Sequence, residues 1–308
     1  AGQAAVSTWN MASGNLVCGG TNWTGVTCTG TNVLDVDRGG LGLAGPALIP
    51  EFSVLVAVTR IKLWNNDLTG TLPPQLSTLT QLRQMHVTQN AISGPIPREW
   101  STMSLVTNMY LHTNLLTGVC PPEWGNMIAL HDFHIYSNQL GGQLPPEWSA
   151  LTDIRRFLIQ NNPYTGTLPP QWSSMSMLTH LAIANSMIAG KIPPQWGSGM
   201  TYMRMLFLEN NALTGRIPAE FSLFSSNNPA ALQYLYLDNN ALTGTIPAVL
   251  SIFTAMTYLG FSGNKLVGNI PAGFSALAAL PQASFKVHTN THLCGTYTAA
   301  NAPADITG

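Results

Sequence analysis

The chain has 308 residues, of which 45% are hydrophobic and only 8% are charged, and its formal net charge is −1. A nucleic-acid-binding surface needs a concentration of Lys and Arg, so this composition excludes nucleic acid as a partner. The sequence contains no run of about 18 apolar residues, and we therefore expect no membrane insertion within it.

Two cysteines near the N-terminus, Cys18 and Cys28, enclose the segment C-G-G-T-N-W-T-G-V-T-C. This segment is too small to form a core of its own, and small segments of this kind in secreted proteins are held by disulfides. We expect residues 1–32 to form a cap in which a Cys18–Cys28 disulfide covers the end of the following array. Asn22 begins an N-glycosylation acceptor, Asn-Trp-Thr; the alternative is that these residues only turn a loop.

The sequence then repeats from residue 33 to about residue 280. A Gly is followed three residues later by a Pro at Gly70, Gly94, Gly118, Gly142, Gly166, Gly190, Gly215, Gly244 and Gly268, with intervals of 24 residues apart from one of 25 and one of 29. A period of about 20–29 residues with the pattern L-x-x-L-x-L-x-x-N-x-L-T-G-x-I/L-P is typical of leucine-rich repeats. We expect an irregular first coil at 33–50, nine regular coils over about 51–274, and a degenerate last coil with a polar tail in 281–308.

Each repeat predicts two short strands. Apolar residues two apart share one face of the first strand and point inward, and the L-T-G-x-I-P segment predicts a second strand on the flank. An Asn column follows the first strands, and its amides must bond neighbouring coils because an unpaired buried amide costs about 1–3 kcal/mol. Ser186 replaces this Asn in one coil, which we expect to be locally weaker. The column consists of Asn66, Asn90, Asn114, Asn138, Asn162, Asn211, Asn240 and Asn264.

A second column contains tryptophans, and we interpret it as a structural spine and not as a ligand site. It consists of Trp100, Trp124, Trp148, Trp172 and Trp196. Cys120 stands where other repeats have Leu or Ile, which predicts a buried thiol that acts as a small hydrophobic residue. The natural partner of Cys294 would belong to a C-terminal cap.

The fold class that follows is a leucine-rich repeat solenoid of the α/β repeat class. We expect mostly parallel strands on a concave face, 3-10 turns or loops on the convex side, a second short sheet on the flank, and a right-handed curved superhelix.

The L-T-G-x-I-P repeat resembles the plant-type leucine-rich repeats of receptor-kinase ectodomains and polygalacturonase-inhibiting proteins. The phrases Q-L-P-P-E-W-S-A-L at 143–151 and T-L-P-P-Q-W-S-S-M at 167–175 are similar to repeats of trypanosomatid surface antigens and proteophosphoglycans. Both resemblances imply an extracellular protein, secreted or at the cell surface.

Outward-facing strand positions supply the candidate binding residues. Neighbouring strands lie about 4.8 Å apart, so the aromatic and imidazole side chains of adjacent coils should form one patch that suits a sugar or a peptide. The alternative is that exposed strand positions favour such residues in any case. The candidates are Trp64, His86, Tyr110, His112, His134 and Tyr136, followed in later coils by Glu209, Tyr236 and Asp238.

Two other interpretations of these residues are weaker. A metal site at His86, His112 and His134 has no supporting carboxylate. Glu209 and Asp238 could form a glycosidase pair, but an open surface offers no pocket to raise the pKa of either carboxyl. If the imidazoles act as charged donors, ligand affinity should change between about pH 5 and 7.5.

The sequence predicts a non-enzymatic extracellular recognition or adhesion module that binds a protein or carbohydrate ligand through the concave face and needs no cofactor. An inhibitor-type repeat protein and a parasite surface ligand are two forms of this prediction. The alternatives are a structural cell-surface coat protein and, less favoured, ice binding through Thr residues of the flank, where Thr69, Thr71, Thr165, Thr167, Thr243 and Thr245 bracket their glycines.

Overall fold

The computed structural model describes residues 25–225, 232–277, 279–290 and 292–294. Cys18, Asn22 and the polar tail after Cys294 lie outside the described residues. The chain divides into two compact units, residues 1–154 and 155–308, and each is described by itself.

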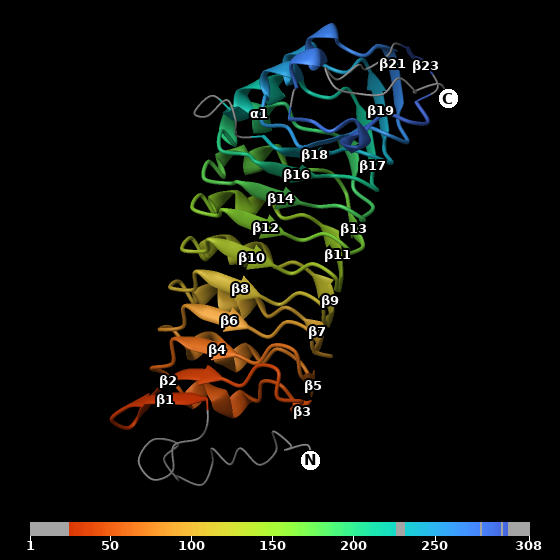
Figure 1. Cartoon of the computed structure of the whole chain (residues 1–308). Coiled ribbons are helices and arrows are strands. Elements are labelled where there is room, and N and C mark those ends of the chain that lie inside the picture. Colours follow the sequence, from red (N-terminus) through yellow and green to blue (C-terminus); the bar gives the residue numbers. More distant parts are fainter. Residues whose placement is uncertain (1–24, 226–231, 278, 291, 295–308) are drawn as a thin grey trace. The chain divides into compact units, whose positions relative to one another are not determined.

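The first unit is built on a parallel sheet with one short strand per repeat (Figure 1). Its strands are β2 (Asn32–Asp37), β4 (Arg60–Lys62), β6 (Gln84–His86), β8 (Asn108–Tyr110) and β10 (Asp132–His134), with β1 (Val26–Thr29) antiparallel to β2 at the edge. The register aligns equivalent residues, so that Ile61 faces Met85, Met85 faces Met109 and Met109 faces Phe133. These central residues are buried, which confirms the predicted inward face.

Flank strands and 3-10 helices complete each coil of the first unit. The flank strands are β3 (Ala44–Pro46), β5 (Asp67–Thr69), β7 (Ser93–Pro95), β9 (Leu115–Val119) and β11 (Gln139–Gln143), paired in parallel as β3 with β5 and as β7, β9 and β11. The 3-10 helices are η3 (Pro50–Val54), η4 (Pro74–Thr78), η5 (Arg98–Thr102), η6 (Pro122–Asn126) and η7 (Pro146–Ala150). The predicted second strand on the flank is therefore confirmed.

The second unit repeats the same plan. Its main strands are β12 (Arg156–Leu158), β14 (His180–Ala182), β16 (Met205–Phe207), β18 (Tyr234–Tyr236), β20 (Tyr258–Gly260) and β22 (Phe285–Lys286). Its flank strands are β13 (Tyr164–Thr165), β15 (Ala189–Lys191), β17 (Ala212–Gly215), β19 (Ala241–Gly244), β21 (Lys265–Asn269) and β23 (His292–Cys294).

One helix of the second unit departs from the 3-10 pattern. Its 3-10 helices are η8 (Pro170–Ser174), η9 (Ala219–Ser225), η10 (Ala248–Ile252), η11 (Ala272–Ala276) and η12 (Gln282–Ser284), whereas α1 (Gln195–Gly199) is an α-helical turn. This turn lies in the coil between Gly190 and Gly215, which is one residue longer than the usual period. An α-turn closes over one more residue than a 3-10 turn, so the extra residue is taken up there. Within the described residues no helix is long and apolar enough to cross a bilayer.

The Asn column forms the predicted ladder between coils. Asn90 Oδ1 accepts the amide of Leu68 at 3.0 Å, and its Nδ2 donates to the carbonyls of Leu63 and Val87 at 3.0 and 3.1 Å. Asn114 and Asn264 bond in the same way. Ser186 is too short to make these bonds. Its Oγ donates to the carbonyl of Asn162 at 2.8 Å, and the Tyr164 amide donates to that same carbonyl at 2.8 Å.

The Trp column is buried, which confirms its structural interpretation. All five indoles have 0% exposure. Four of them donate Nε1–H to a proline carbonyl of the preceding repeat at 2.9–3.0 Å: Trp100 to Pro73, Trp124 to Pro97, Trp148 to Pro121 and Trp196 to Pro169.

The cysteines differ in environment. Cys28 is disulfide-bonded; Cys18, its predicted partner, lies outside the described residues. Cys120 is 2% exposed, as a small hydrophobic residue would be. Cys294 is an exposed thiol.

Candidate functional site

Six predicted residues of the first unit meet on the open face of its parallel sheet, and we call them the aromatic patch: Trp64, His86, Tyr110, His112, His134 and Tyr136. Cross-strand register places His86 beside Tyr110 and Tyr110 beside His134. Their ring centroids lie 5.1 Å and 4.9 Å apart, and Trp64 stacks 6.1 Å from His86. His112 and Tyr136 stack 4.1 Å apart with an interplanar angle of 9°.

Two glycines of the preceding coil leave room for the Trp64 side chain. The indole lies on the backbone of Gly39, where any Cβ would collide with its ring atoms. Gly40 next to it has φ +65°, a conformation that favours glycine. Gly39 was not among the predicted residues, and the Gly-Gly pair at 39–40 is the feature of the sequence that marks it.

A polar network holds Tyr110, and it too was missed. Asn108 Nδ2 donates to the Tyr110 hydroxyl at 2.9 Å and to Asp132 Oδ2 at 2.8 Å. The Tyr110 hydroxyl donates to the same Asp132 oxygen at 3.3 Å, and Asp132 is only 8% exposed. These three residues stand at the ends of short strands, where polar residues usually face solvent. Their polar character in the sequence therefore did not indicate a hydrogen-bonded network.

Burial lowers the pKa of two imidazoles of the patch, His86 and His112. Burial, followed by the charge of Lys62, lowers the pKa of His86. Burial, followed by His134 and His86, lowers the pKa of His112 to about 4. The expectation of an affinity change between about pH 5 and 7.5 through charged imidazoles is therefore wrong for His112, since partial burial among other rings disfavours its cation.

The histidines of the patch pack against neighbouring rings. His112 and His134 have centroids 6.1 Å apart, and His86 Nε2 lies 3.0 Å from the Thr88 hydroxyl. In the part of the chain that the structure describes, no three His, Cys, Asp or Glu side chains are placed to hold a metal ion.

The other three predicted residues form a separate cluster in the second unit. Tyr236 stacks on Tyr258 with a centroid distance of 3.9 Å. Asp238 Oδ1 accepts the Ser262 amide at 2.9 Å, and its other oxygen occupies the space that a Cβ of Gly260 would need. Glu209 belongs to the same cluster, since its charge, after burial, raises the pKa of Tyr236.

Burial changes the ionisation of both carboxyls in this cluster. It raises the pKa of Glu209 from 4.5 to about 7, and it also raises the pKa of Asp238. The expectation that the open surface leaves both values unraised is thus wrong, because neighbouring side chains partly cover the two groups.

Comparison with known proteins gives a short sequence match and many structural matches. The Leucine Rich Repeat family model matches residues 231–252. A search of curated proteins finds no match to this sequence. The crystal structure of a TDR receptor is 26% identical with a TM-score of 0.75, over 80% of this chain and 41% of that one.

Two further solved structures share the fold. The ectodomain of the Arabidopsis receptor kinase HAESA, in complex with an IDA peptide hormone, is 25% identical with a TM-score of 0.76, over 84% of this chain and 42% of that one. A plant ice-binding protein is 24% identical with a TM-score of 0.73, over 89% of this chain and 86% of that one. The chain thus spans less than half the length of the TDR receptor and of HAESA.

Proposed function

Because the chain is a leucine-rich repeat protein with plant-type repeats, we propose that it is a non-enzymatic extracellular recognition module whose ligand is a peptide or protein segment. The aromatic patch carries this proposal, since it gathers six rings from neighbouring coils on one open face. The HAESA structure, a fold relative, contains a peptide hormone.

The chemistry of the patch suits an uncharged stretch of ligand. Its rings combine apolar area with hydroxyl and ring-nitrogen groups at their edges, a combination enriched at recognition surfaces. Trp64 is 37% exposed and the other five rings are partly exposed, so ligand groups can pack on faces that are already held in place. Rings that neighbours hold rigid lose little conformational entropy on binding, which favours affinity.

The test uses peptide and glycan arrays probed with the folded protein, followed by a double substitution. We expect His112→Ala with Tyr136→Ala to weaken binding of any retained peptide by at least about 2 kcal/mol, the scale of an interface hot spot. Both rings of the stacked pair are removed together, because a single substitution would leave the other ring without its stacking partner. Tyr136→Phe keeps the ring and should keep most of the affinity.

Tyr202→Ala provides a matched control, because Tyr202 lies in a turn with 43% exposure outside the patch. Normal peptide binding by the double variant would contradict the site. Binding of glycans only would replace the peptide with a carbohydrate, and uniformly empty arrays would favour a structural coat protein.

The non-enzymatic part of the proposal has its own test, since the raised pKa of Glu209 is a property that a general acid needs. Glycan hydrolysis by the wild type that Glu209→Gln abolishes would overturn it.

Ice binding through the flank is a second candidate, favoured by one observation. Thr69, Thr71, Thr165, Thr167, Thr243 and Thr245 are all exposed on the flank. Lys191 and Arg216 interrupt this pattern in the second unit. Thermal hysteresis in solutions of the protein, lost on changing Thr165 and Thr167 to Lys, would establish this function.

A further inference from the structure

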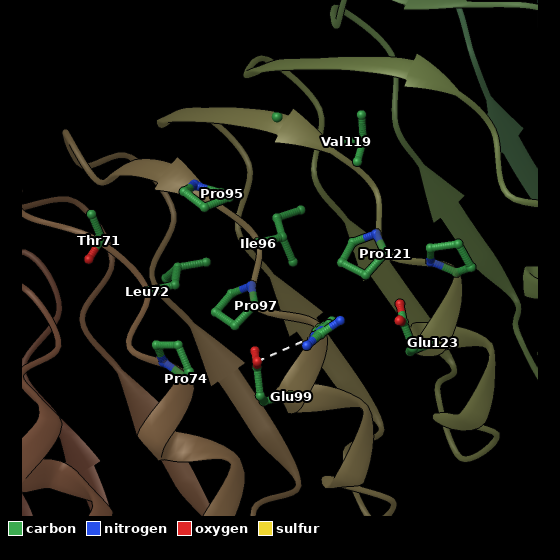
Figure 2. A pocket seen from close by; sticks show the side chains of 13 residues that line it. Thr71, Leu72, Pro74, Pro95, Ile96, Pro97, Glu99, Val119, Pro121 and Glu123 are labelled. Carbon is green, nitrogen blue, oxygen red and sulfur yellow. Dashed lines mark ion pairs between the residues drawn. The ribbon is translucent and has the colours of Figure 1, made fainter.

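A groove opens on the flank of the first unit, away from the strands that carry the aromatic patch (Figure 2). It has a volume of about 660 Å³ and takes equivalent residues from three successive repeats. Leu72, Ile96 and five prolines give it an apolar lining. Thr71, Pro95 and Val119 line its side toward the flank strands, and Glu99 and Glu123 lie on the helical side (Figure 2).

Short residues after the glycines leave the groove open on its flank side. In this part of the chain the residue after the glycine is Thr71, Pro95 or Val119, all short. In the second unit it is long in two coils, as Lys191 and Arg216, whose side chains run along the flank next to Gly215 and Gly244, and it is Thr167, Thr245 or Asn269 in the others. Val119 is 61% exposed, so its side chain is accessible to a ligand in the groove.

The groove is rigid as well as apolar. Each proline fixes its backbone φ near −65° and removes an amide donor, so the lining has few ways to rearrange. A volume between about 300 and 1,000 Å³ with a mainly apolar lining and a few polar groups is the usual character of a ligand site.

Charge at the rim indicates the sign of the occupant. Glu99 and Glu123 lie in the first turns of η5 and η6. Glu99 is paired with Arg98, whose Nε lies 3.5 Å from Glu99 Oε1. Among the described residues Glu123 takes part in no ion pair, so the net charge of this rim is negative and its open carboxylate complements a cation.

We propose that this flank groove binds an extended peptide segment of a partner protein, with one or two large apolar side chains in the groove and a Lys or Arg against Glu123. The lining presents equivalent apolar surfaces in series, one from each repeat, and a peptide presents side chains in series. This goes beyond recognition at the aromatic patch, because it assigns a second site on a different face.

A peptide array tests the proposal. Its members combine Phe, Trp, Tyr, Leu, Ile or Val at two positions with Arg, Lys, Glu or Asp at a third, and the whole protein is the probe. We expect retention of Arg and Lys members to exceed that of Glu and Asp members about ten-fold, the effect of one charge-assisted contact.

Two substitutions and two matched controls locate the binding. Val119→Lys should abolish retention, because it places a long cation across the groove; the fold tolerates it, since Lys191 occupies the equivalent place in another coil. Glu123→Gln should remove the preference for Arg and Lys. Thr167→Lys and Glu147→Gln make the same changes at equivalent positions outside the groove and should bind as the wild type does.

Three results would overturn the proposal. One is an array that retains nothing, and another is equal retention by the wild type and Val119→Lys at unchanged melting temperature. The third is self-association of the wild type that Val119→Lys abolishes, because the occupant would then be a second copy of the chain. The His112→Ala and Tyr136→Ala double variant should bind these peptides normally, which separates this site from the aromatic patch.

Discussion

Single side chains at the turn after each strand determine how neighbouring coils are joined. A ladder Asn bonds both to its own turn and to the coil before it, as Asn90 does with Val87 and Leu68. The residue before it adopts positive φ, for example 55° at Gln89 and 57° at Thr113, and Asn185 before Ser186 does so too, with φ 52°. Ser186 breaks the ladder, and a surface hollow of about 330 Å³ lies beside it, lined in part by Asn162, Ser186 and Met187.

Ser186→Asn should therefore stabilise the second unit. The new side chain fits the hollow and gives the Tyr164 amide an acceptor from the next coil, as Asn90 does for Leu68. Each added hydrogen bond contributes about 0.5–1.5 kcal/mol net, and urea denaturation measures the gain. Asn90→Ser is the reverse change and should destabilise the first unit by a similar amount; a loss of stability in Ser186→Asn would show that the hollow does not accept an amide.

At the scale of the element, the 3-10 turn of each repeat depends on one large side chain. The Trp124 ring lies parallel to that of Trp100, with centroids 6.3 Å apart, and its centroid is 5.4 Å from that of Phe133. Its Nε1–H also donates a hydrogen bond to the Pro97 carbonyl. Other repeats fill the same slot with Leu76, Phe221, Leu250 and Phe274, all with 0% exposure. The slot thus requires volume, and the indole hydrogen bond is an addition that only Trp provides.

Trp124→Ala should lower the free energy of unfolding by about 3–5 kcal/mol, because it leaves a cavity in the core. Trp124→Phe should cost less, since Phe221 and Phe274 show that the slot accepts a phenyl ring; its cost is mainly the lost hydrogen bond to Pro97. Chemical denaturation compares the two variants. Equal costs would contradict a volume requirement, and unchanged stability with lost ligand binding would place the indole in a binding site.

For the whole molecule, the sparse charge makes a few buried ionisable groups important for the pH dependence of stability. Burial raises the pKa of Glu209 from 4.5 to about 7, so the folded state holds this proton more tightly than the unfolded chain does. The contribution of Glu209 is complete below about pH 4.5 and is lost as the pH rises through about 7. His112 acts in the opposite direction: its contribution is present above pH 6.5 and is lost as the pH falls toward about 4.

Melting temperatures of the wild type and Glu209→Gln between about pH 4.5 and 7 should isolate the contribution of Glu209 to stability. The wild type should lose stability relative to the variant between about pH 4.5 and 7, because Gln carries no charge at any pH. Glu220→Gln, at an exposed position of η9, is the control and should follow the wild type. Parallel pH curves for wild type and Glu209→Gln would show that Glu209 is solvated and ionises normally.

The amino-acid sequence by itself determined the repeat, the inward face of each strand, the Asn ladder, the flank strands and the buried Trp column. Each of these follows from the spacing of residues within one coil, and stacking identical coils multiplies the local pattern. The tertiary structure alone decided the seat of Trp64 on Gly39, the Asn108–Tyr110–Asp132 network, the shifted pKa values of His112 and Glu209, and the groove beside Val119. These features depend on distances and burial between side chains of different coils, and a one-dimensional period carries no information about how far two side chains cover each other.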